Sequence, residues 1–299
     1  MKKALLTGGS GFIGSHLIAK LKNENCDIVC MGRTAVDSCD NYIINDFANI
    51  DETRDIVNTV QPDYLFHLAG SVCLDFQNSF RVNTIFGHNI LKSISLLGLE
   101  TKIKILFVGS AAEYGIVSQS DMPVTESTPT YPYSNHGISK LASTLSAISW
   151  SGDKKHLSVV RPFTVIGDGV PEYLAVGNFI NQITNGYDGM TLKTGDLSTA
   201  RDFVDVEDVV EIFWKLINNK KSYGQVFNIC SGRPVMISEI LEYIIDKVKI
   251  DINIQTSSDL IREIDMPVHY GSNKKLIELI GPMKFISWKE SIDKIVLEL

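Results

Sequence analysis

A glycine-rich segment near the amino terminus carries the clearest chemical signal in the sequence. Thr7–Gly14 reads Thr-Gly-Gly-Ser-Gly-Phe-Ile-Gly, directly after the apolar run Ala4–Leu6 and directly before a helical pattern. A strand that turns tightly into a helix directs backbone N–H groups and the positive helix end at one point. Gly8 permits the turn, Gly11 allows a pyrophosphate to approach, and Gly14 allows close packing. We therefore predict a dinucleotide site here, with contacts from Gly8, Ser10, Gly11, Phe12, Ile13 and Gly14.

The end of the second predicted strand indicates which dinucleotide binds. An NAD site usually has an acidic residue about 20 residues after the glycine turn, where this chain has Met31-Gly32-Arg33-Thr34. A carboxylate would bind the ribose hydroxyls and repel a 2′-phosphate, whereas a guanidinium attracts the phosphate and can stack on adenine. Arg33 therefore favours NADP(H). NAD(H) stays open, because a solvated surface arginine would look the same in the sequence.

Short apolar runs alternate with helical patterns through the first half of the chain. Strands are predicted over Lys3–Leu6, Asp27–Met31, Tyr42–Ile44, Tyr64–His67, Ile103–Val108, Ser158–Arg161 and Val226–Cys230. Helices are predicted over Ile13–Lys22, Ile50–Val60, Phe80–Leu97, Gly137–Trp150, Val206–Asn218, Ile237–Val248 and Asn273–Ile280. Buried strands joined by crossover helices form an α/β fold with a doubly wound parallel sheet.

This alternation also predicts the domain organisation. We expect a Rossmann domain over residues 1–166, rejoined by about 203–232, where a helix and a strand return. A smaller C-terminal substrate lobe is expected over residues 167–299, mainly about 167–202 and 233–299. Ligands of doubly wound folds bind at the carboxyl ends of the strands, so we expect the lobe to close over that edge.

Composition excludes several classes of function. The 299 residues carry a net charge of −7 with scattered basic residues, which argues against a nucleic-acid partner or an anionic membrane surface. No segment approaches the roughly 18 apolar residues of a membrane-spanning helix. The five cysteines show neither metal-ligand spacing nor a paired framework. We expect free thiols in a reducing compartment, a cytoplasmic location and no metal site.

Several motifs resemble the extended short-chain dehydrogenase/reductase family of nucleotide-sugar epimerases, dehydratases and reductases, over nearly the whole chain. The matching segments are Thr7–Gly14 (T-G-x-x-G-x-x-G), His67–Gly70 (H-L-A-A), Asn83 with Gly87 following (the helix Asn of N-x-x-G), Gly109–Gly115 (S-x-x-x-Y-G), Arg161–Gly167 (R-P-x-N-V-Y-G) and Arg201–Val206 (R-D-F-V-H-V). The resemblance implies cofactor contacts from Asp46, Phe47, Leu68, Ala69, Gly70, Asn83 and Lys140. It implies substrate contacts from Ser110, Ala111, Ala112, Thr164 (where the family has Asn), Asn178, Arg201 and Arg262.

Within the family, the chain is most similar to the GDP-4-keto-6-deoxymannose reductases, through Gly109–Gly115, Gly195–Phe203 and Phe227–Gly232. Ser110 takes the place of the Ser or Thr that binds the sugar 4-oxygen, at the expected end of a strand. The family's 4,6-dehydratases follow that residue with two acids, for which this chain has Ala111 and Ala112. Glu113 comes one residue later and is expected to face the opposite side of an extended strand. The sequence therefore disfavours dehydration.

The catalytic pair of the family, Tyr-x-x-x-Lys, departs from its pattern here. The matching residues are His136-Gly137-Ile138-Ser139-Lys140, so positions 136 and 140 share a helix face but the tyrosine is replaced. Tyr133 lies seven residues from Lys140 and is expected to precede the helix, so it does not simply substitute. In the family this lysine binds the nicotinamide ribose. Its charge stabilises a tyrosinate but opposes an imidazolium.

Three functional hypotheses remain open at this point. The first is NADPH-dependent reduction at C4 of a nucleotide-linked 4-keto-6-deoxy sugar by a homodimer, with Ser110, His136 and Lys140 as catalytic residues. The second is a nucleotide-sugar epimerase or atypical dehydratase that recycles its NAD(P). The third is a catalytically impaired binding homologue, because His136 replaces the tyrosine.

Overall fold

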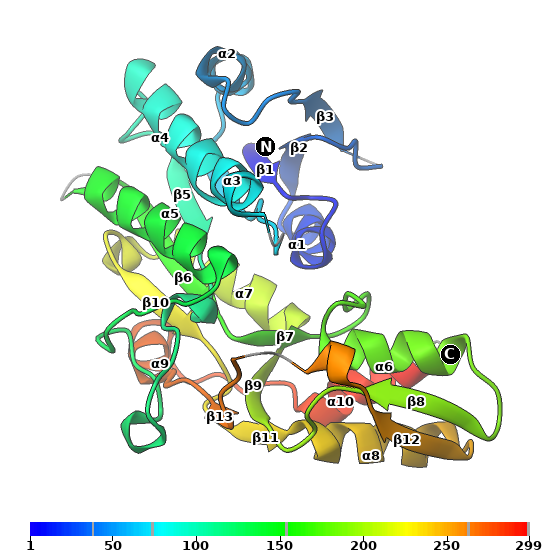
Figure 1. Cartoon of the computed structure of the whole chain (residues 1–299). Helices are drawn as coiled ribbons and strands as arrows, with labels where there is room; N and C mark the ends of the chain where they lie inside the picture. Colours follow the sequence, from blue (N-terminus) through cyan, green and yellow to red (C-terminus); the bar gives the residue numbers. More distant parts are fainter. Residues whose placement is uncertain (38, 73–74, 153–154, 262–263, 298–299) are drawn as a thin grey trace.

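The computed structural model describes residues 1–37, 39–72, 75–152, 155–261 and 264–297. A seven-stranded sheet lies at its centre with the strand order β10-β6-β5-β4-β1-β2-β3, and every neighbouring pair in it is parallel (Figure 1). The strands are β1 (Lys2–Thr7), β2 (Cys26–Gly32), β3 (Asp40–Ile43), β4 (Tyr64–His67), β5 (Lys104–Val108), β6 (Leu157–Pro162) and β10 (Val226–Ile229). This order confirms the predicted doubly wound parallel sheet.

Helices cover both faces of this sheet, because both faces of its strands are apolar. One face carries α1 (Phe12–Asn23), α7 (Val206–Ile217) and α9 (Lys274–Ile280), which pack around Leu17, Phe213 and Leu276. The other carries α2 (Ile50–Val60), α4 (Phe86–Leu96) and α5 (Asn135–Ser151). The predicted helix Phe80–Leu97 is divided into α3 (Phe76–Phe80), a π-helical turn over Arg81–Ile85, and α4.

Smaller sheets lie below the carboxyl ends of the central strands (Figure 1). One combines β7 (Thr164–Ile166), β9 (Ala200–Asp205), β11 (Pro234–Met236) and β13 (Val268–His269). The other pairs β8 (Met190–Thr194) with β12 (Ile252–Thr256). They pack with α6 (Ala175–Thr184), α8 (Ile237–Val248) and α10 (Trp288–Val296) around a separate apolar core.

The topology places the glycine turn at the switch point of the sheet. β1 pairs with β2 on one side and with β4 on the other, so successive crossovers leave from it in opposite directions. The loops after β1 and β4 therefore diverge and leave a crevice at their carboxyl ends, which is where doubly wound folds bind ligands. Gly8 follows β1 directly and has φ +75°, a conformation that favours glycine.

Candidate active site

A cavity of about 460 Å³ opens at this crevice; we call it the central cavity. It brings together predicted residues from both halves of the chain, and its lining includes Gly8, Gly11, Phe12, Ile13, Gly14, Leu68, Gly70, Ser110, Ala111, Ala112, His136, Lys140, Thr164 and Arg201. The glycine turn, the loops after β4 and β5, and the first turns of α5 thus meet at one place. All three predicted catalytic residues line this cavity.

The amino terminus of α1 is suited to a pyrophosphate. Gly11 is the N-cap residue in an extended conformation, it provides no side-chain cap, and the first turn of the helix has no acidic residue. The backbone N–H groups of that turn therefore remain available to bind an anion, which the positive end of the helix dipole also attracts. A side chain at Gly14 would overlap the Gly8 carbonyl, so the close turn requires glycine there. These residues fit the phosphate bridge of a nicotinamide dinucleotide.

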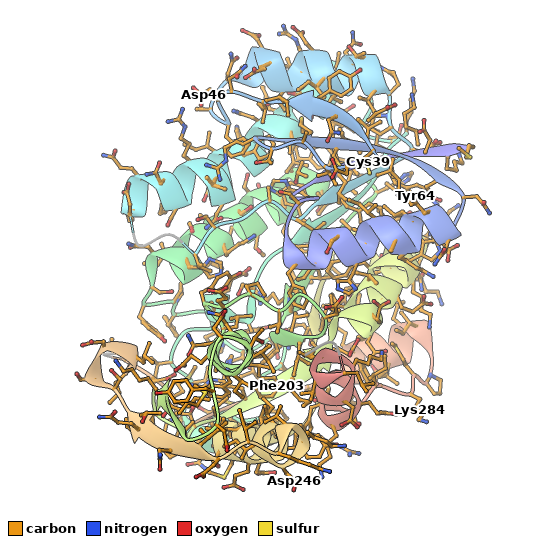
Figure 2. All side chains as sticks on the ribbon, turned by 90° about the vertical axis from the view of Figure 1, so that its right-hand side faces the viewer. Cys39, Asp46, Tyr64, Phe203, Asp246 and Lys284 are labelled. Atoms are coloured by element: carbon orange, nitrogen blue, oxygen red, sulfur yellow. The ribbon has the colours of Figure 1, made fainter. Side chains whose placement is uncertain are left out.

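The residues predicted to bind the adenosine end lie away from the central cavity. The exposed Arg33 guanidinium lies 5.5 Å from the centroid of the buried Phe47 ring. Asp46 accepts a hydrogen bond of 2.5 Å from Arg81, and this contact, after the backbone hydrogen bond from Ala48, lowers its pKa. Figure 2 shows Asp46 at the outer part of the larger sheet and Phe203 in the opposite half of the molecule. Arg33 thus presents an exposed cation at the predicted adenosine region, whereas the charge of Arg81 is compensated by Asp46.

Lys140 is buried in the wall of the central cavity. Its Nζ donates a 2.9 Å hydrogen bond to the Val108 carbonyl at the end of β5. Burial lowers its pKa to about 8, against the opposing effect of Glu113. A Cβ atom at Gly70 would lie 2.8 Å from this Nζ, so the glycine, where the family pattern has alanine, gives the ammonium its space.

His136 lies one helical turn before Lys140, as the spacing predicts. Its Nδ1 is 3.0 Å from the Ser71 carbonyl oxygen. Burial, and then the charge of Lys140, lower the pKa of His136 below its ordinary 6.5, while the carbonyl acts in the opposite direction. The residue is therefore a neutral imidazole at neutral pH. Tyr133 precedes α5, as expected, and its hydroxyl donates to the Ile264 carbonyl at 3.3 Å.

The segment around Ser110 differs from the sequence prediction. β5 ends at Val108, and Ser110 begins a one-turn 3₁₀ helix over Ala111–Glu113 rather than ending a strand. The prediction that Glu113 lies on an extended strand is therefore wrong, because the capping box of this turn folds its side chain back. Glu113 Oε1 accepts from the Ser110 backbone N–H at 2.9 Å, and Ser110 Oγ accepts from the Ala112 N–H at 3.1 Å.

Glu113 forms a buried ion pair behind this turn. Its Oε2 accepts from Arg161 Nε at 2.7 Å, and its Oε1 also accepts from Thr144 Oγ1 at 2.9 Å. Burial raises the pKa of Glu113, and Arg161 opposes that rise. Three donors converge on this carboxylate, so it supports the Ser110 turn from behind and does not line the cavity.

Asn83 lies in a second layer behind His136. Its Nδ2 donates to the Ser71 carbonyl at 3.0 Å and to Ser139 Oγ at 2.9 Å, while its Oδ1 accepts from the Ser71 N–H at 2.7 Å. Asn83 is fully buried and Ala69 is buried, and neither residue lines the cavity. Asn83 therefore holds the loop after β4 against α5.

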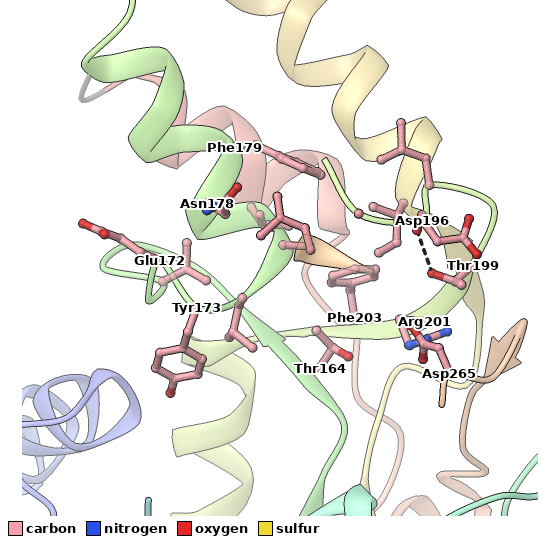
Figure 3. Close-up of a pocket in the computed structure, with 18 of the residues that line it drawn as sticks. Thr164, Glu172, Tyr173, Asn178, Phe179, Asp196, Thr199, Arg201, Phe203 and Asp265 are labelled. Carbon is pink, nitrogen blue, oxygen red and sulfur yellow. Dashed lines mark hydrogen bonds and ion pairs between the residues drawn. The ribbon is translucent and has the colours of Figure 1, made fainter. Parts of the chain in front are cut away.

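A second cavity of about 340 Å³ adjoins the first among the smaller sheets; we call it the lobe cavity. Asn178 lines it, and Thr164 and Arg201 line both cavities. Figure 3 shows Arg201 beside Asp265, with which it forms an ion pair, and Tyr173 on the other side. Arg262, the remaining predicted substrate contact, lies outside the described residues.

The sequence analysis missed several residues of this region. Tyr173, Ser71 and His269 line the central cavity, and so does Tyr133, which the sequence analysis considered only as a substitute for the absent tyrosine. The His67 side chain is buried, and its Nδ1 lies 2.9 Å from Thr7 Oγ1, linking β4 to β1. Most of these residues reach the cavity because a loop covers it or because a backbone carbonyl faces it. Neither arrangement has a sequence signature. Among the described residues, no cluster of three or more His, Cys, Asp and Glu side chains could hold a metal ion.

The family model and the similar curated proteins agree on the family of this chain. Residues 4–230 match the model described as "NAD dependent epimerase/dehydratase family". GDP-6-deoxy-D-mannose reductase of Pseudomonas aeruginosa is 26% identical over 99% of this chain and 96% of its own length. GDP-6-deoxy-D-talose 4-dehydrogenase of Aggregatibacter actinomycetemcomitans is 28% identical over 93% of this chain and 91% of its own length.

Solved structures share the architecture. RMD from Pseudomonas aeruginosa, complexed with NADPH, has a TM-score of 0.83 and 25% identity, covering 100% of this chain and 98% of that one. UDP-glucose 4-epimerase from Thermotoga maritima, with UDP-glucose, has a TM-score of 0.87 and 22% identity over 99% and 97% of the two chains. No helix in the described part of the chain has the length and hydropathy to span a membrane. The chain belongs to the NAD dependent epimerase/dehydratase family, within the extended short-chain dehydrogenases/reductases.

Proposed function

We propose that this protein reduces a nucleotide-linked 4-keto-6-deoxy sugar at C4, using NADPH. The observation that carries the proposal is the central cavity, in which the glycine turn faces Ser110, His136 and Lys140. The names of two relatives describe redox reactions of GDP-linked 6-deoxy sugars, and one of them specifies position 4. A GDP-linked sugar is therefore the first substrate class to test.

The chain's own residues can divide the work as follows. The α1 amino terminus binds the phosphate bridge, and Arg33 favours the 2′-phosphate of NADPH. The cofactor supplies the hydride. Lys140 holds the nicotinamide ribose, and the Ser110 hydroxyl donates a hydrogen bond to the sugar 4-oxygen. Arg201 and Asn178, which line the lobe cavity, hold the nucleotide part in this proposal.

The test is a reduction assay with the purified protein, NADPH and a panel of 4-keto-6-deoxy sugars linked to GDP, dTDP or UDP. With at least one sugar, we expect net oxidation of NADPH, measured as a loss of near-ultraviolet absorbance. NMR of the product should show a hydroxyl group at C4. The variant Ser110→Ala removes this hydroxyl together with its hydrogen bond from the Ala112 N–H, and we expect it to lower kcat about a hundredfold. Absence of turnover with every sugar contradicts the proposal.

An epimerase that recycles its cofactor is the second candidate, because UDP-glucose 4-epimerase of Lactobacillus helveticus is 27% identical over 80% of this chain and 80% of its own length. Cofactor that copurifies with the protein and shows no net redox change during sugar conversion would favour it. Binding of cofactor and sugar without any conversion would instead favour the impaired binding homologue.

We also propose a cytoplasmic homodimer. The exposed side chains of Ile85, Leu96 and Leu145 lie on the adjoining helices α4 and α5 and the π-helical turn before α4, with 40%, 56% and 60% of their surface exposed. The cysteines that the structure describes are free thiols, consistent with a reducing compartment. Light scattering should give twice the chain mass, and Leu145→Glu should shift it toward the monomer; a monomeric wild type contradicts the dimer.

A further inference from the structure

We propose that His136 exchanges a proton with the sugar 4-oxygen through Nε2, giving it in the reduction and taking it in the reverse oxidation, because the Ser71 carbonyl fixes the other ring nitrogen as the N–H donor. The inference rests on the proposed function and assigns the direction of proton movement at its site. The distance between Nδ1 and the carbonyl oxygen is 3.0 Å. A carbonyl oxygen can only accept, so Nδ1 must carry the proton. In the neutral ring, Nε2 then has a lone pair and no hydrogen.

The carbonyl that fixes the tautomer is itself held in place. Ser71 accepts a second hydrogen bond from Asn83 Nδ2 at 3.0 Å, and its N–H donates to Asn83 Oδ1 at 2.7 Å. A carbonyl oxygen has two lone pairs, and these two donors occupy both. From the helix side, Ser139 Oγ donates to the His136 carbonyl at 3.0 Å. Asn83 is thus a positioning residue for the imidazole.

The surrounding charges keep the ring neutral. Lys140 lies one turn further along α5, and its ammonium opposes a second positive charge. Burial acts in the same direction and more strongly, so the pKa of His136 lies below its ordinary 6.5. Other ionisable groups that line the same cavity are Tyr133, Tyr173, His269 and the Arg201–Asp265 pair. That pair is internally neutralised, and burial lowers the pKa of His269 to about 4.

The two directions of the reaction therefore need different forms of His136. In oxidation, the C4–H bond breaks and its electron pair leaves as hydride for the oxidised nicotinamide. The O4–H bond breaks, its proton moves to Nε2, and the C4=O double bond forms. In reduction, Nε2 must already carry a proton, so only the imidazolium can donate it. Oxidation should be favoured above the pKa of His136 and reduction below it.

The first test observes the ring without substrate. Uniform 15N-histidine labelling and long-range 1H–15N correlation distinguish the two neutral tautomers, and His136→Asn assigns the signal among the six histidines. We expect a proton on Nδ1, a bare Nε2, and titration below 6.5. Asn83→Ala should release the Ser71 carbonyl and mix the tautomers. A neutral His136 with its proton on Nε2 overturns the inference.

The second test measures kcat/KM against pH in both directions. For oxidation we expect a rise through the His136 titration and a fall as Lys140 deprotonates at about 8. In His136→Asn, the amide N–H can still donate to the Ser71 carbonyl, but no group reaches the position of Nε2. In His136→Gln, an amide that does not titrate reaches that position. Both should lose about 10² to 10⁴ in rate together with the lower inflection.

Tyr133→Phe is the matched control, since this hydroxyl lines the same cavity, and it should retain the lower inflection. If His136→Asn keeps that inflection, or Tyr133→Phe removes it, His136 is not the proton acceptor. Absence of turnover with every sugar in both directions overturns the proposed function together with the inference. Turnover with a proton on Nε2 overturns the inference alone.

Discussion

Two groups of buried charges flank the Ser110 turn, and they are satisfied to different degrees. Behind the turn, Glu113 accepts hydrogen bonds from Arg161, Thr144 and the Ser110 backbone. On the cavity side, Lys140 donates to a neutral carbonyl, and burial lowers its pKa to about 8. The first group is complete without a ligand and stabilises the fold. The second group bears an electrostatic cost in the free protein, which a bound ligand can relieve.

Breaking the complete pair should have the largest effect of all. Arg161→Met leaves the Glu113 carboxylate buried without its cation, and we expect the free energy of unfolding to fall by about 3–5 kcal/mol. Urea unfolding followed by circular dichroism measures the change. The control is Arg161→Met combined with Glu113→Gln, which leaves no buried charge and should recover part of the loss. Equal stability of the wild type and the single variant would show that the pair is not structural.

Removing the cavity cation should separate activity from stability. Lys140→Met takes away the ribose contact and the charge, and kcat/KM should fall about a hundredfold or more. The free energy of unfolding should stay level or rise, because an incompletely compensated buried charge is replaced by an apolar side chain. Steady-state kinetics and urea unfolding of the same preparation test both parts. A large loss of stability would place Lys140 with the structural group.

The same lysine predicts how stability depends on pH. The pKa of Lys140 falls from 10.5 to about 8 on folding. Between these values the unfolded chain binds more protons than the folded one, so this residue's contribution raises stability as pH increases. The excess in free energy of unfolding of Lys140→Met over the wild type should therefore be greatest below pH 8 and should shrink as the pH rises toward 10.5. Denaturant midpoints across this range measure it, and a constant difference would contradict the lowered pKa.

Replacing the exposed cation Arg33 should have the smallest effect, and it serves as a reference for the two buried groups of charges. Arg33 lies over Phe47 with its guanidinium accessible to solvent. Arg33→Ala should weaken NADPH binding about tenfold, or about 1.4 kcal/mol, and leave NADH binding nearly unchanged. Unfolding should change by less than about 0.5 kcal/mol. Calorimetric titration of the wild type and Arg33→Ala with NADPH and with NADH measures these affinities. An equal loss of affinity for the two cofactors would contradict a contact with the 2′-phosphate.

The sequence predicted the central sheet well because its strands are buried on both faces. All seven predicted strands, including Val226–Cys230, correspond to strands of that sheet within a few residues. The smaller sheets were not predicted, since strands such as β12 are short and mostly exposed and so lack a continuous apolar pattern. Their pairing also joins segments far apart in the chain, as when β13 pairs with β9.

The candidate site followed a similar division. Helical spacing was enough to place His136 and Lys140 together, and motif context placed Ser110 beside them. The pairing of Glu113 with Arg161 depends on a one-turn helix that no periodicity indicates. The hydrogen bond between His136 and Ser71 involves a backbone carbonyl, which every residue has, so residue identity could not reveal it.

Gly70 gives the side chain of Lys140 more room than the alanine of the family pattern would. A methyl group at this position would lie 2.8 Å from Nζ and 3.1 Å from Cε of Lys140. The family pattern combines alanine at this position with the same lysine, so the flexible end of Lys140 must be able to shift away from such a methyl group. Gly70→Ala should therefore change the position of the ammonium rather than the fold.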